Sequence, residues 1–354
     1  MTRAMGNGVV ADAHNDLLMA VHHLGHDRDY FRRVWLPQLH EGGVGLQVLP
    51  VYVDEVWIPE SALRQTLRLV ETALEMIERC SDEVALCLKP GNVEEALRSG
   101  RIAIVLALEG CSALGQDVEV LHTLFRLGVR VASLTHFGRN SLADGSAEEG
   151  TQSRLTRAGL RAVQLMEQLG ILVDVSHLSL LGTQQILEIC SRPVMASHSS
   201  CHALRPHHRN LPDRELLAIA NTGGVVGINF FPSYLTDGQA SIEMVVDHIK
   251  HAAGVAGIEH IGLGPDFTRE VSKLLYAGSH VIEGCDLGDA VPGLSGPGDF
   301  PALKEALVAR GLSAADIAAV MGGNFVRLMN ESIGGAGANP VRPGPEGATA
   351  SGVV

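Results

Sequence analysis

Three consecutive stretches of the chain define its fold class: VRVASLT (129–135), RLTRAGLRAVQLMEQLG (154–170) and ILVDVS (171–176). The first and third are short, apolar and rich in β-branched residues, which is typical of buried strands. In the second, apolar residues recur three and four positions apart, which predicts an amphipathic helix. Two strands joined by such a helix pair in parallel, because a parallel pair needs a long crossover connection.

The same alternation continues on both sides of this unit. Further strand-like runs lie at 8–13, 44–53, 101–108, 193–197, 224–230 and 260–267, and further helix-like segments at 61–80, 118–128, 213–223 and 241–257. Eight strand–helix units in 354 residues predict a single (βα)8 TIM barrel over residues 1–333, with a doubly wound sheet as the alternative. Residues 334–354 are rich in Gly, Pro and Ala without an apolar period, so we expect a disordered tail.

Composition excludes several classes of partner. The chain has 27 Lys and Arg against 40 Asp and Glu, a net charge of −13, which disfavours binding to nucleic acid or to an anionic membrane surface. Its six cysteines form no Cys-x-x-Cys pair and are too sparse for a disulfide framework. Because neither a signal-peptide run nor an apolar stretch of about 20 residues is evident, we expect a cytoplasmic protein without a membrane span.

Ionisable residues follow most of the predicted strands, at the strand ends where barrel enzymes carry their chemistry. These residues are His14, Asp16, Glu109, His136, His177, His198 and Asp266. Burying so many ionisable groups without a countercharge would cost several kcal/mol each. A divalent metal supplies that charge, and a donor set of histidines and carboxylates without thiolates suits Zn²⁺.

Spacing suggests how the ligands are shared. His14 and Asp16 lie two apart and face the same way on an extended chain, so they can hold one ion. Glu109 could bridge two ions through its two oxygens, and His177 and His198 could complete a second site. Two ions roughly 3.5 to 4 Å apart would hold a bridging hydroxide as the nucleophile. Each histidine taken singly could instead be an ordinary core or surface residue, whereas their joint placement favours a metal centre.

Two further residues have open alternatives. Asp266, in GLGPDF (262–267), is placed to accept a proton from a metal-bound water, or it could be a helix cap or turn residue. Arg209, in a loop after the sixth run, suits a substrate carboxylate, or it could simply be solvated. The Gly- and Pro-bearing connection at 268–299 is expected to cover the substrate.

An ordered set of sequence blocks resembles the membrane (renal) dipeptidase family of zinc dipeptidases. The blocks are ADAHNDL (11–17), ALEG (107–110), SLTHFGRNSLADG (133–145), LVDVSHLS (172–179), ASHSSCHALRPHHRNLPD (196–213), GLGPDF (262–267) and MGGNFVRLM (321–329). The resemblance implies a barrel, often homodimeric, with two Zn²⁺ ions held by His14, Asp16, Glu109, His177 and His198. It also implies that His136 contacts the scissile carbonyl oxygen, that Arg209 and Tyr234 bind the C-terminal carboxylate, and that Asp266 transfers the proton.

The resulting prediction is a zinc-dependent dipeptidase for dipeptides with a free C-terminal carboxylate, including L-Xaa-D-Xaa. One alternative is another binuclear amidohydrolase acting on N-acyl amino acids or lactones, although those enzymes usually have His-x-His where this chain has His14-x-Asp16. A second is a barrel protein that binds ligands without catalysis. The chain departs from the family at Thr268, where many relatives have a second Asp, and at Cys111 and Ser112, which could alter the pocket for the amino-terminal side chain.

Overall fold

The computed structural model describes residues 8–275, 281–282 and 285–335. All eight predicted strands are present: β1 (Val10–Asp12), β2 (Val44–Tyr52), β4 (Ile102–Glu109), β5 (Val129–Ser133), β6 (Leu172–Asp174), β7 (Val194–Met195), β8 (Val226–Ile228) and β9 (Ile261–Leu263). Three short strands were not predicted: β3 (Val84–Leu86), β10 (Val281–Ile282) and β11 (Cys285–Asp286). The chain therefore has the expected α/β character.

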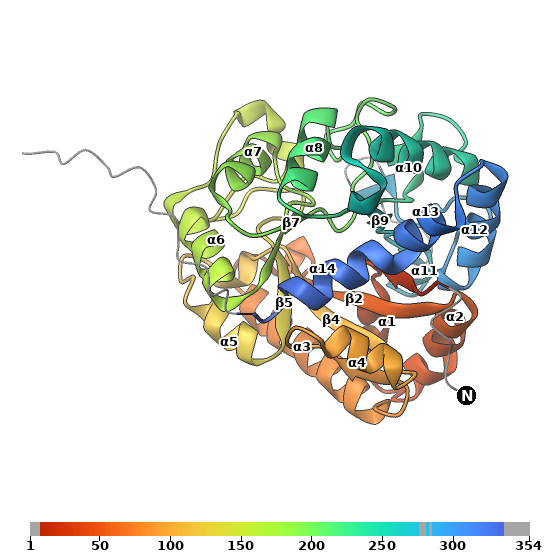
Figure 1. Cartoon of the computed structure of the whole chain (residues 1–354). Helices are drawn as coiled ribbons and strands as arrows, with labels where there is room; N and C mark the ends of the chain where they lie inside the picture. The colour runs from red at the N-terminus through yellow and green to blue at the C-terminus, as the bar shows by residue number, and fades with distance from the viewer. Residues whose placement is uncertain (1–7, 276–280, 283–284, 336–354) are drawn as a thin grey trace, which may run out of the picture.

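The strands form a curled parallel sheet in the order β1-β2-β4-β5-β6-β7 (Figure 1). Strand β3 also pairs with β4 in parallel. Strands β8 and β9 pair with each other in parallel as a separate two-stranded sheet. The predicted closed barrel is therefore shown only in part, because no continuous ladder joins these two sheets among the described residues. The two seams carry isolated contacts instead: a bridge between Ala196 and Val226, and a 3.0 Å hydrogen bond from Ala13 N to Leu263 O.

The predicted helices appear as α3 (Ala62–Arg79), α5 (Val120–Arg126), α6 (Arg157–Leu169), α8 (Asp213–Asn221) and α10 (Ile242–Ala256). The others are α1 (Leu17–His23), α2 (Leu36–Glu41), α4 (Asn92–Arg98), α7 (Leu180–Ile189), α9 (Pro232–Leu235), α11 (Arg269–Leu275), α12 (Phe300–Ala309), α13 (Ala314–Ala318) and α14 (Asn324–Ser332). Helix α6 shows local control of its ends: the Thr156 hydroxyl accepts from Gly159 N at its start, and Gly170 ends it in a left-handed conformation.

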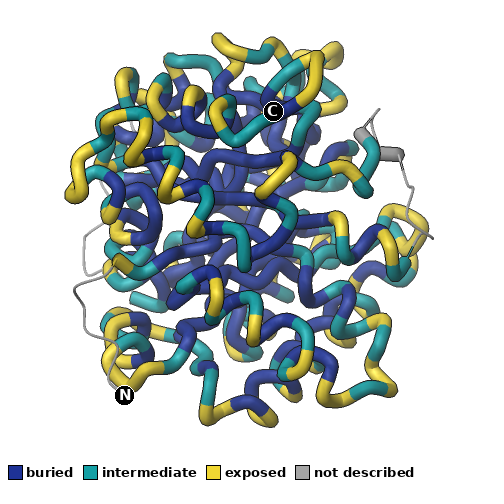
Figure 2. Tube along the Cα trace, turned by 90° about the vertical axis from the view of Figure 1, so that its right-hand side faces the viewer, coloured by how far each residue is buried: buried dark blue, intermediate teal, exposed yellow. Residues whose placement is uncertain are grey.

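Alternation along β4 divides the core into two layers. Ala103, Val105 and Ala107 share a cluster with Phe325 of α14, whereas the intervening β4 residues pack in the cluster that contains most of the surrounding helices. Buried segments fill the interior and exposed ones line the outside (Figure 2). By the same period of two, Glu109 at the end of β4 is on the same face as Ala103, Val105 and Ala107.

Two expectations concern the C-terminal part. The connection at 268–299 contains α11, β10 and β11, and part of it lies outside the described residues. At the start of the predicted tail, Gly334 N donates to Gly170 O at 2.8 Å, while residues 336–354 lie outside the described residues. Within the described ranges, no helix combines the length and apolar character needed to cross a membrane.

Candidate metal centre

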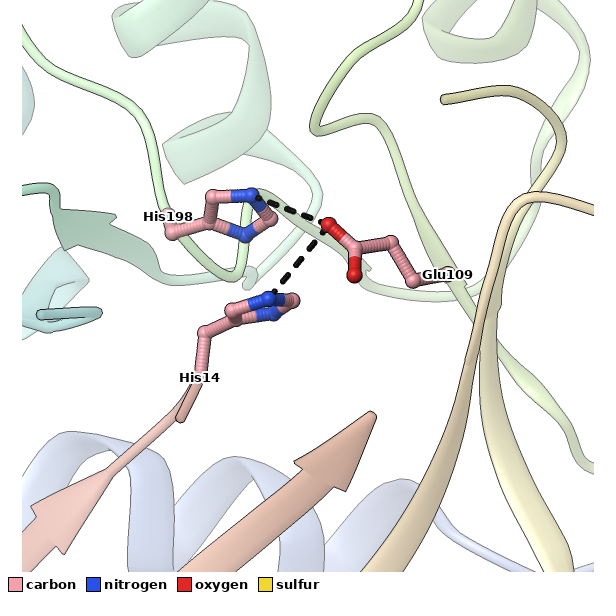
Figure 3. Close-up of side chains that lie close together, drawn as sticks. All are labelled: His14, Glu109 and His198. Atoms are coloured by element: carbon pink, nitrogen blue, oxygen red, sulfur yellow. Dashed lines mark ion pairs between the residues drawn. The ribbon is translucent and has the colours of Figure 1, made fainter. Parts of the chain in front are cut away.

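Glu109 is the centre of a cluster of imidazoles. Its Oε1 lies 3.0 Å from His177 Nε2, 3.4 Å from His14 Nε2, 3.7 Å from His198 Nε2 and 4.0 Å from His136 Nε2. Figure 3 shows ring nitrogens of His14 and His198 directed at this carboxylate. The four histidines follow four different strands, so the curled sheet brings together side chains that are far apart in sequence.

A tight turn after β1 sets the position of His14. The Asp12 carboxylate accepts from the backbone N of His14 at 3.0 Å and from Asn15 Nδ2 at 3.2 Å. Asn15 Oδ1 in turn accepts from Leu17 N at 3.1 Å, at the start of α1. Asx turns of this kind end a strand while leaving the intervening side chain free to face the cluster. Asp16 follows directly, with its Oδ1 3.8 Å from His14 Nε2.

Two of the strand-end residues have left-handed backbone conformations. His177 has a φ of 68° and Asp266 a φ of 60°. This region is uncommon for residues other than Gly, Asn and Asp, and such strain persists at functional sites because the surrounding structure imposes it. The carboxylate of Asp266 has its Oδ1 4.0 Å from His14 Nε2 and accepts from Asn229 Nδ2 at 3.0 Å through Oδ2.

The electrostatics of the cluster are dominated by burial and by Glu109. Burial opposes protonation of His14, but the negative charge of Glu109, with its Oε1 3.4 Å from His14 Nε2, outweighs burial and raises the pKa of His14 to about 10. Burial likewise opposes ionisation of Glu109, yet His14 and His177 hold the pKa of Glu109 well below its usual value. Burial raises the pKa of Asp16, and the charge of Glu109 adds to that shift. Burial lowers the pKa of His177 and of His198, so positive charge is favoured on His14 alone among these three imidazoles.

The donor atoms fit a divalent metal. Three overlapping sets each bring their ligand atoms within 4.8 Å of one another: His14, Glu109 and His198; Glu109, His136 and His177; and His14, Asp16 and Asp266. His14 Nε2 and Asp16 Oδ1 are buried without a hydrogen-bond partner among the described residues. Buried polar atoms are rarely left unpaired, so these two atoms fit the role of ligands to a cation. Imidazole and carboxylate donors without a thiolate suit zinc.

Arg209 and Tyr234 lie beside this cluster. The buried Arg209 guanidinium donates to His198 O at 3.0 Å and contacts Ser199 Oγ at 3.4 Å. Its Cζ is 5.6 Å from the centre of the Tyr234 ring, and Tyr234 is itself buried on α9. The structure thus places next to each other the two residues that sequence reasoning assigned to the substrate carboxylate.

His136 occupies the side of the cluster near the end of β2. Its ring centre lies 4.3 Å from that of His177 and 4.7 Å from that of Tyr52. Burial lowers the pKa of His136 to about 4, so the ring is neutral near pH 7 and has one N–H to donate. Sequence reasoning missed Tyr52, because the signal it used was a His, Asp or Glu at a strand end.

Thr268, the departure from the family pattern, takes a structural contact. Its Oγ1 donates to Leu287 O at 2.9 Å, and the residue is buried. The side chain thereby links the segment directly after β9 to Leu287, in the connection that follows α11. An Asp at this position would need a different partner, because a carboxylate cannot donate to a carbonyl when ionised.

Comparison with known proteins identifies a family. The family model for membrane dipeptidases, peptidase family M19, matches residues 1–334. Dipeptidase aclJ of Aspergillus oryzae is 33% identical over 319 residues, covering 86% of this chain and 71% of that protein. Dipeptidase verJ of Clonostachys rogersoniana is 34% identical over 270 residues, covering 76% and 65% respectively.

Solved structures share the fold over nearly the whole chain. The crystal structure of a metallopeptidase named dipeptidase AC has a TM-score of 0.82 at 25% identity and covers 93% of this chain and all of that one (100%). A metallopeptidase from Rhodobacter sphaeroides, solved with a phosphinate mimic of L-Ala-D-Ala, has a TM-score of 0.81 at 24% identity, covering 92% and 99%.

Proposed function

Because the chain belongs to the membrane dipeptidase family of metallopeptidases, we propose that it is a zinc dipeptidase acting on dipeptides with a free C-terminal carboxylate. The observation that carries this proposal is the convergence of His14, His177 and His198 on one oxygen of Glu109. Burying a carboxylate among several imidazoles costs folding free energy unless a cation compensates, so a purely structural role for this cluster is disfavoured.

The proposed ligand set holds two zinc ions. His14 and Asp16 would hold the first, His177 and His198 the second, and Glu109 both. The distances alone also allow His14 to share an ion with His198, so the division of ligands between the ions rests on the family resemblance. Bound zinc would polarise the scissile carbonyl and lower the pKa of a coordinated water.

Arg209 and Tyr234 would bind the substrate carboxylate. Arg209 Nε is buried and has no hydrogen-bond partner among the described residues, so it offers a donor in addition to those that already bind His198 O and Ser199 Oγ. A guanidinium donor set matches a carboxylate in charge and geometry. Because Arg209 lies beside the ligand His198, little room remains between the carboxylate and the metals. This limit on length favours dipeptides over longer peptides.

Asp266 and His136 would carry the proton and the developing charge. Burial raises the pKa of Asp266, against the opposing charge of His14, so its carboxyl is suited to holding a proton during the reaction. Asn229 fixes Oδ2 of this carboxylate, leaving Oδ1 toward His14. The neutral His136 ring would donate a hydrogen bond to the carbonyl oxygen as it becomes negative.

The proposed scaffold is a closed (βα)8 barrel that forms one domain over residues 1–333. The isolated bridge between Ala196 and Val226 and the hydrogen bond from Ala13 to Leu263 support closure at the two seams. A homodimer and a cytoplasmic location, both expected from the sequence, belong to the same proposal. Light scattering of the purified protein and fractionation of cells test these two points.

Metal removal and a substrate panel test the proposed activity. We expect the purified protein to contain zinc, to hydrolyse L-Ala-L-Ala and L-Ala-D-Ala, and to leave N-acetyl-L-Ala unchanged. The L,D substrate is included because the related Rhodobacter protein was solved with an L-Ala-D-Ala mimic. Chelation should abolish hydrolysis and added zinc should restore it. Activity confined to N-acyl amino acids or lactones would instead support the other class of amidohydrolase, and absence of both zinc binding and hydrolysis would support a binding protein.

A further inference from the structure

Ser197 lies between the proposed ligand His198 and a buried carboxylate, Asp174. Ser197 Oγ is 2.7 Å from His198 Nδ1 and 2.5 Å from Asp174 Oδ2, and all three residues are buried. We propose that Asp174 and Ser197 are positioning residues that fix the tautomer of His198, so that its Nε2 carries the lone pair for the metal. The inference rests on the proposed role of His198 as a ligand and adds two residues to that site.

The direction of the Ser197 hydroxyl proton follows from the bonds already made to Asp174. Asp174 Oδ1 accepts from the backbone N of Ser176 and of Ser197, each at 2.9 Å. This leaves Oδ2 for the hydroxyl, and an ionised carboxylate can only accept. Ser176 Oγ, at 3.2 Å, is a more distant competitor for the same proton. The single hydroxyl proton of Ser197 therefore points to Asp174.

This direction determines the state of His198. Because the Ser197 proton is committed to Asp174, Ser197 Oγ presents a lone pair to His198 Nδ1, which must then carry the ring proton. A neutral imidazole has only one N–H, so Nε2 is the unprotonated nitrogen. That nitrogen faces the centre, 3.7 Å from Glu109 Oε1 and 2.8 Å from His177 Nε2 (Figure 3 shows it beside Glu109).

His177 and His198 differ in the hydrogen bonding of their Nδ1 atoms. His177 Nδ1 is buried and has no hydrogen-bond partner among the described residues. The hydrogen-bonded pair of Asp174 and Ser197, called the relay below, thus acts on His198 and not on His177. Residues of this kind, which bind the far nitrogen of a metal-ligating histidine, typically change metal affinity about 10- to 100-fold when mutated.

Asp174→Asn is the sharpest test, because the structure predicts which way the new amide turns. The carbonyl oxygen of the amide should take the place of Oδ1, where two backbone N–H groups need an acceptor. Its NH₂ group then faces Ser197 Oγ as a donor. The Ser197 proton is released from position 174 and turns to His198 Nδ1, which becomes the acceptor. The ring proton moves to Nε2, where it blocks metal binding.

The experiment has two readouts that do not depend on catalysis. Long-range ¹H–¹⁵N spectra of the metal-free protein, labelled at histidine and assigned with His198→Gln, should show the Nδ1–H tautomer in the wild type and the Nε2–H tautomer in Asp174→Asn. Competition with a chromophoric chelator should show the zinc dissociation constant rising about 10- to 100-fold in Asp174→Asn. Ser197→Ala, which only removes the hydroxyl that accepts from His198 Nδ1, should weaken zinc binding without imposing the Nε2–H form. This variant also tests the relay if Asp174→Asn does not fold.

Ser200→Ala is the matched control, because Ser200 is equally buried and its hydroxyl donates to Asn229 O at 3.0 Å, away from His198. It should keep the wild-type tautomer and zinc affinity. An Nε2–H tautomer in the wild type, or unchanged zinc affinity in both relay variants, overturns the relay. If the wild type hydrolyses dipeptides with zinc while the variants match it, the relay alone fails. If the wild type neither binds zinc nor hydrolyses dipeptides, the proposed function fails, and the tautomers still test the relay.

Discussion

Asp266 combines a left-handed backbone conformation with the proposed role of proton carrier, which makes one substitution especially informative. Asn tolerates the left-handed φ of 60° and can still accept from Asn229 through its carbonyl oxygen, so Asp266→Asn should fold normally. The variant lacks the carboxyl that we propose holds the proton. We therefore expect kcat for dipeptide hydrolysis to fall by at least about 100-fold, with zinc content intact.

The control for this variant is Glu305→Gln, which removes an exposed carboxylate from α12, outside the connection that follows β9. It should leave kcat within about twofold of the wild type. Near-normal turnover in Asp266→Asn would remove Asp266 from the mechanism, and loss of zinc would instead make it a ligand.

Individual residues also show which parts of the candidate site could be predicted from the sequence and which could not. Strand ends predicted His14, Glu109 and His198, because an ionisable residue after an apolar run is visible in the sequence. The positioning roles of Asp174 and Ser197 were not predicted from the sequence, because they depend on a hydrogen bond between two residues that lie 23 positions apart in the chain. Asp174 lies within a predicted strand, where nothing distinguishes a relay from an ordinary buried carboxylate.

At the scale of elements, Gly227 on β8 and Gly264 directly after β9 allow the His198 segment to lie close to these strands. A Cβ on Gly264 would come 1.9 Å from Ser197 O and 2.8 Å from His198 Cα, and a Cβ on Gly227 would come 2.1 Å from Ser197 O. Gly264→Ala should therefore push the ligand segment aside. We expect the free energy of unfolding to fall by about 1–3 kcal/mol, as in overpacked cores, and zinc affinity to fall with it.

Gly254→Ala provides the comparison, because Gly254 is exposed in the interior of α10 and a Cβ there meets no atom within 4 Å. Replacing glycine in a helix should raise the free energy of unfolding by about 0.5–1 kcal/mol. Urea denaturation of both variants measures the difference. Equal stabilities would show that the approach of β9 to the His198 segment is not constrained.

The connection between β5 and α6 is stabilised by an ion pair whose pH dependence can be predicted. Arg139 donates to both oxygens of the buried Asp144, with an Nη2 to Oδ2 distance of 3.0 Å, and Thr151 Oγ1 also donates to Oδ2. The hydrogen bonds from Arg139 lower the pKa of Asp144 below its usual value of 3.8. A lowered pKa stabilises the folded state fully above the pKa of the unfolded chain, and the stabilisation is lost as pH falls through the folded pKa.

The wild type should accordingly be more stable than Asp144→Asn by a constant margin from pH 7 to about pH 5, and the margin should close below about pH 4. Urea unfolding midpoints at pH 7, 5 and 3.5 measure it. Glu71→Gln on the exposed face of α3 controls for the loss of one charge. A margin that stayed constant to pH 3.5 would mean that Asp144 contributes through shape rather than charge.

At the scale of the whole molecule, the sequence predicted the order and direction of the eight strands but not how completely they join. Strand number and parallel pairing follow from the alternation of apolar runs and helices. Continuity of the ladder depends on strand length, and β7, β8 and β9 have only two or three residues each. Apolar runs at 193–197, 224–230 and 260–267 are longer than these strands, so an apolar run predicts a strand without giving the length of its ladder.

Helix α14 packs its buried face against both sheets, and this gives the last prediction. Phe325 is fully buried, packs with β4 residues such as Val105, and would lie 2.5 Å from a Cβ on Gly262 of β9. In Figure 1, α14 crosses in front of the strands near the centre of the view. Phe325→Ala should lower the free energy of unfolding by about 3–5 kcal/mol. Because Phe325 packs among apolar side chains and is not one of the candidate metal-ligating residues, kcat well below the unfolding temperature should stay within about twofold of the wild type. Val308→Ala on α12, where the side chain is 59% exposed, should change stability by less than about 0.5 kcal/mol. Urea unfolding at a fixed zinc concentration measures both variants, since bound metal adds to the apparent stability. If Phe325→Ala were as stable as Val308→Ala, α14 would not be what holds β8 and β9 against the larger sheet.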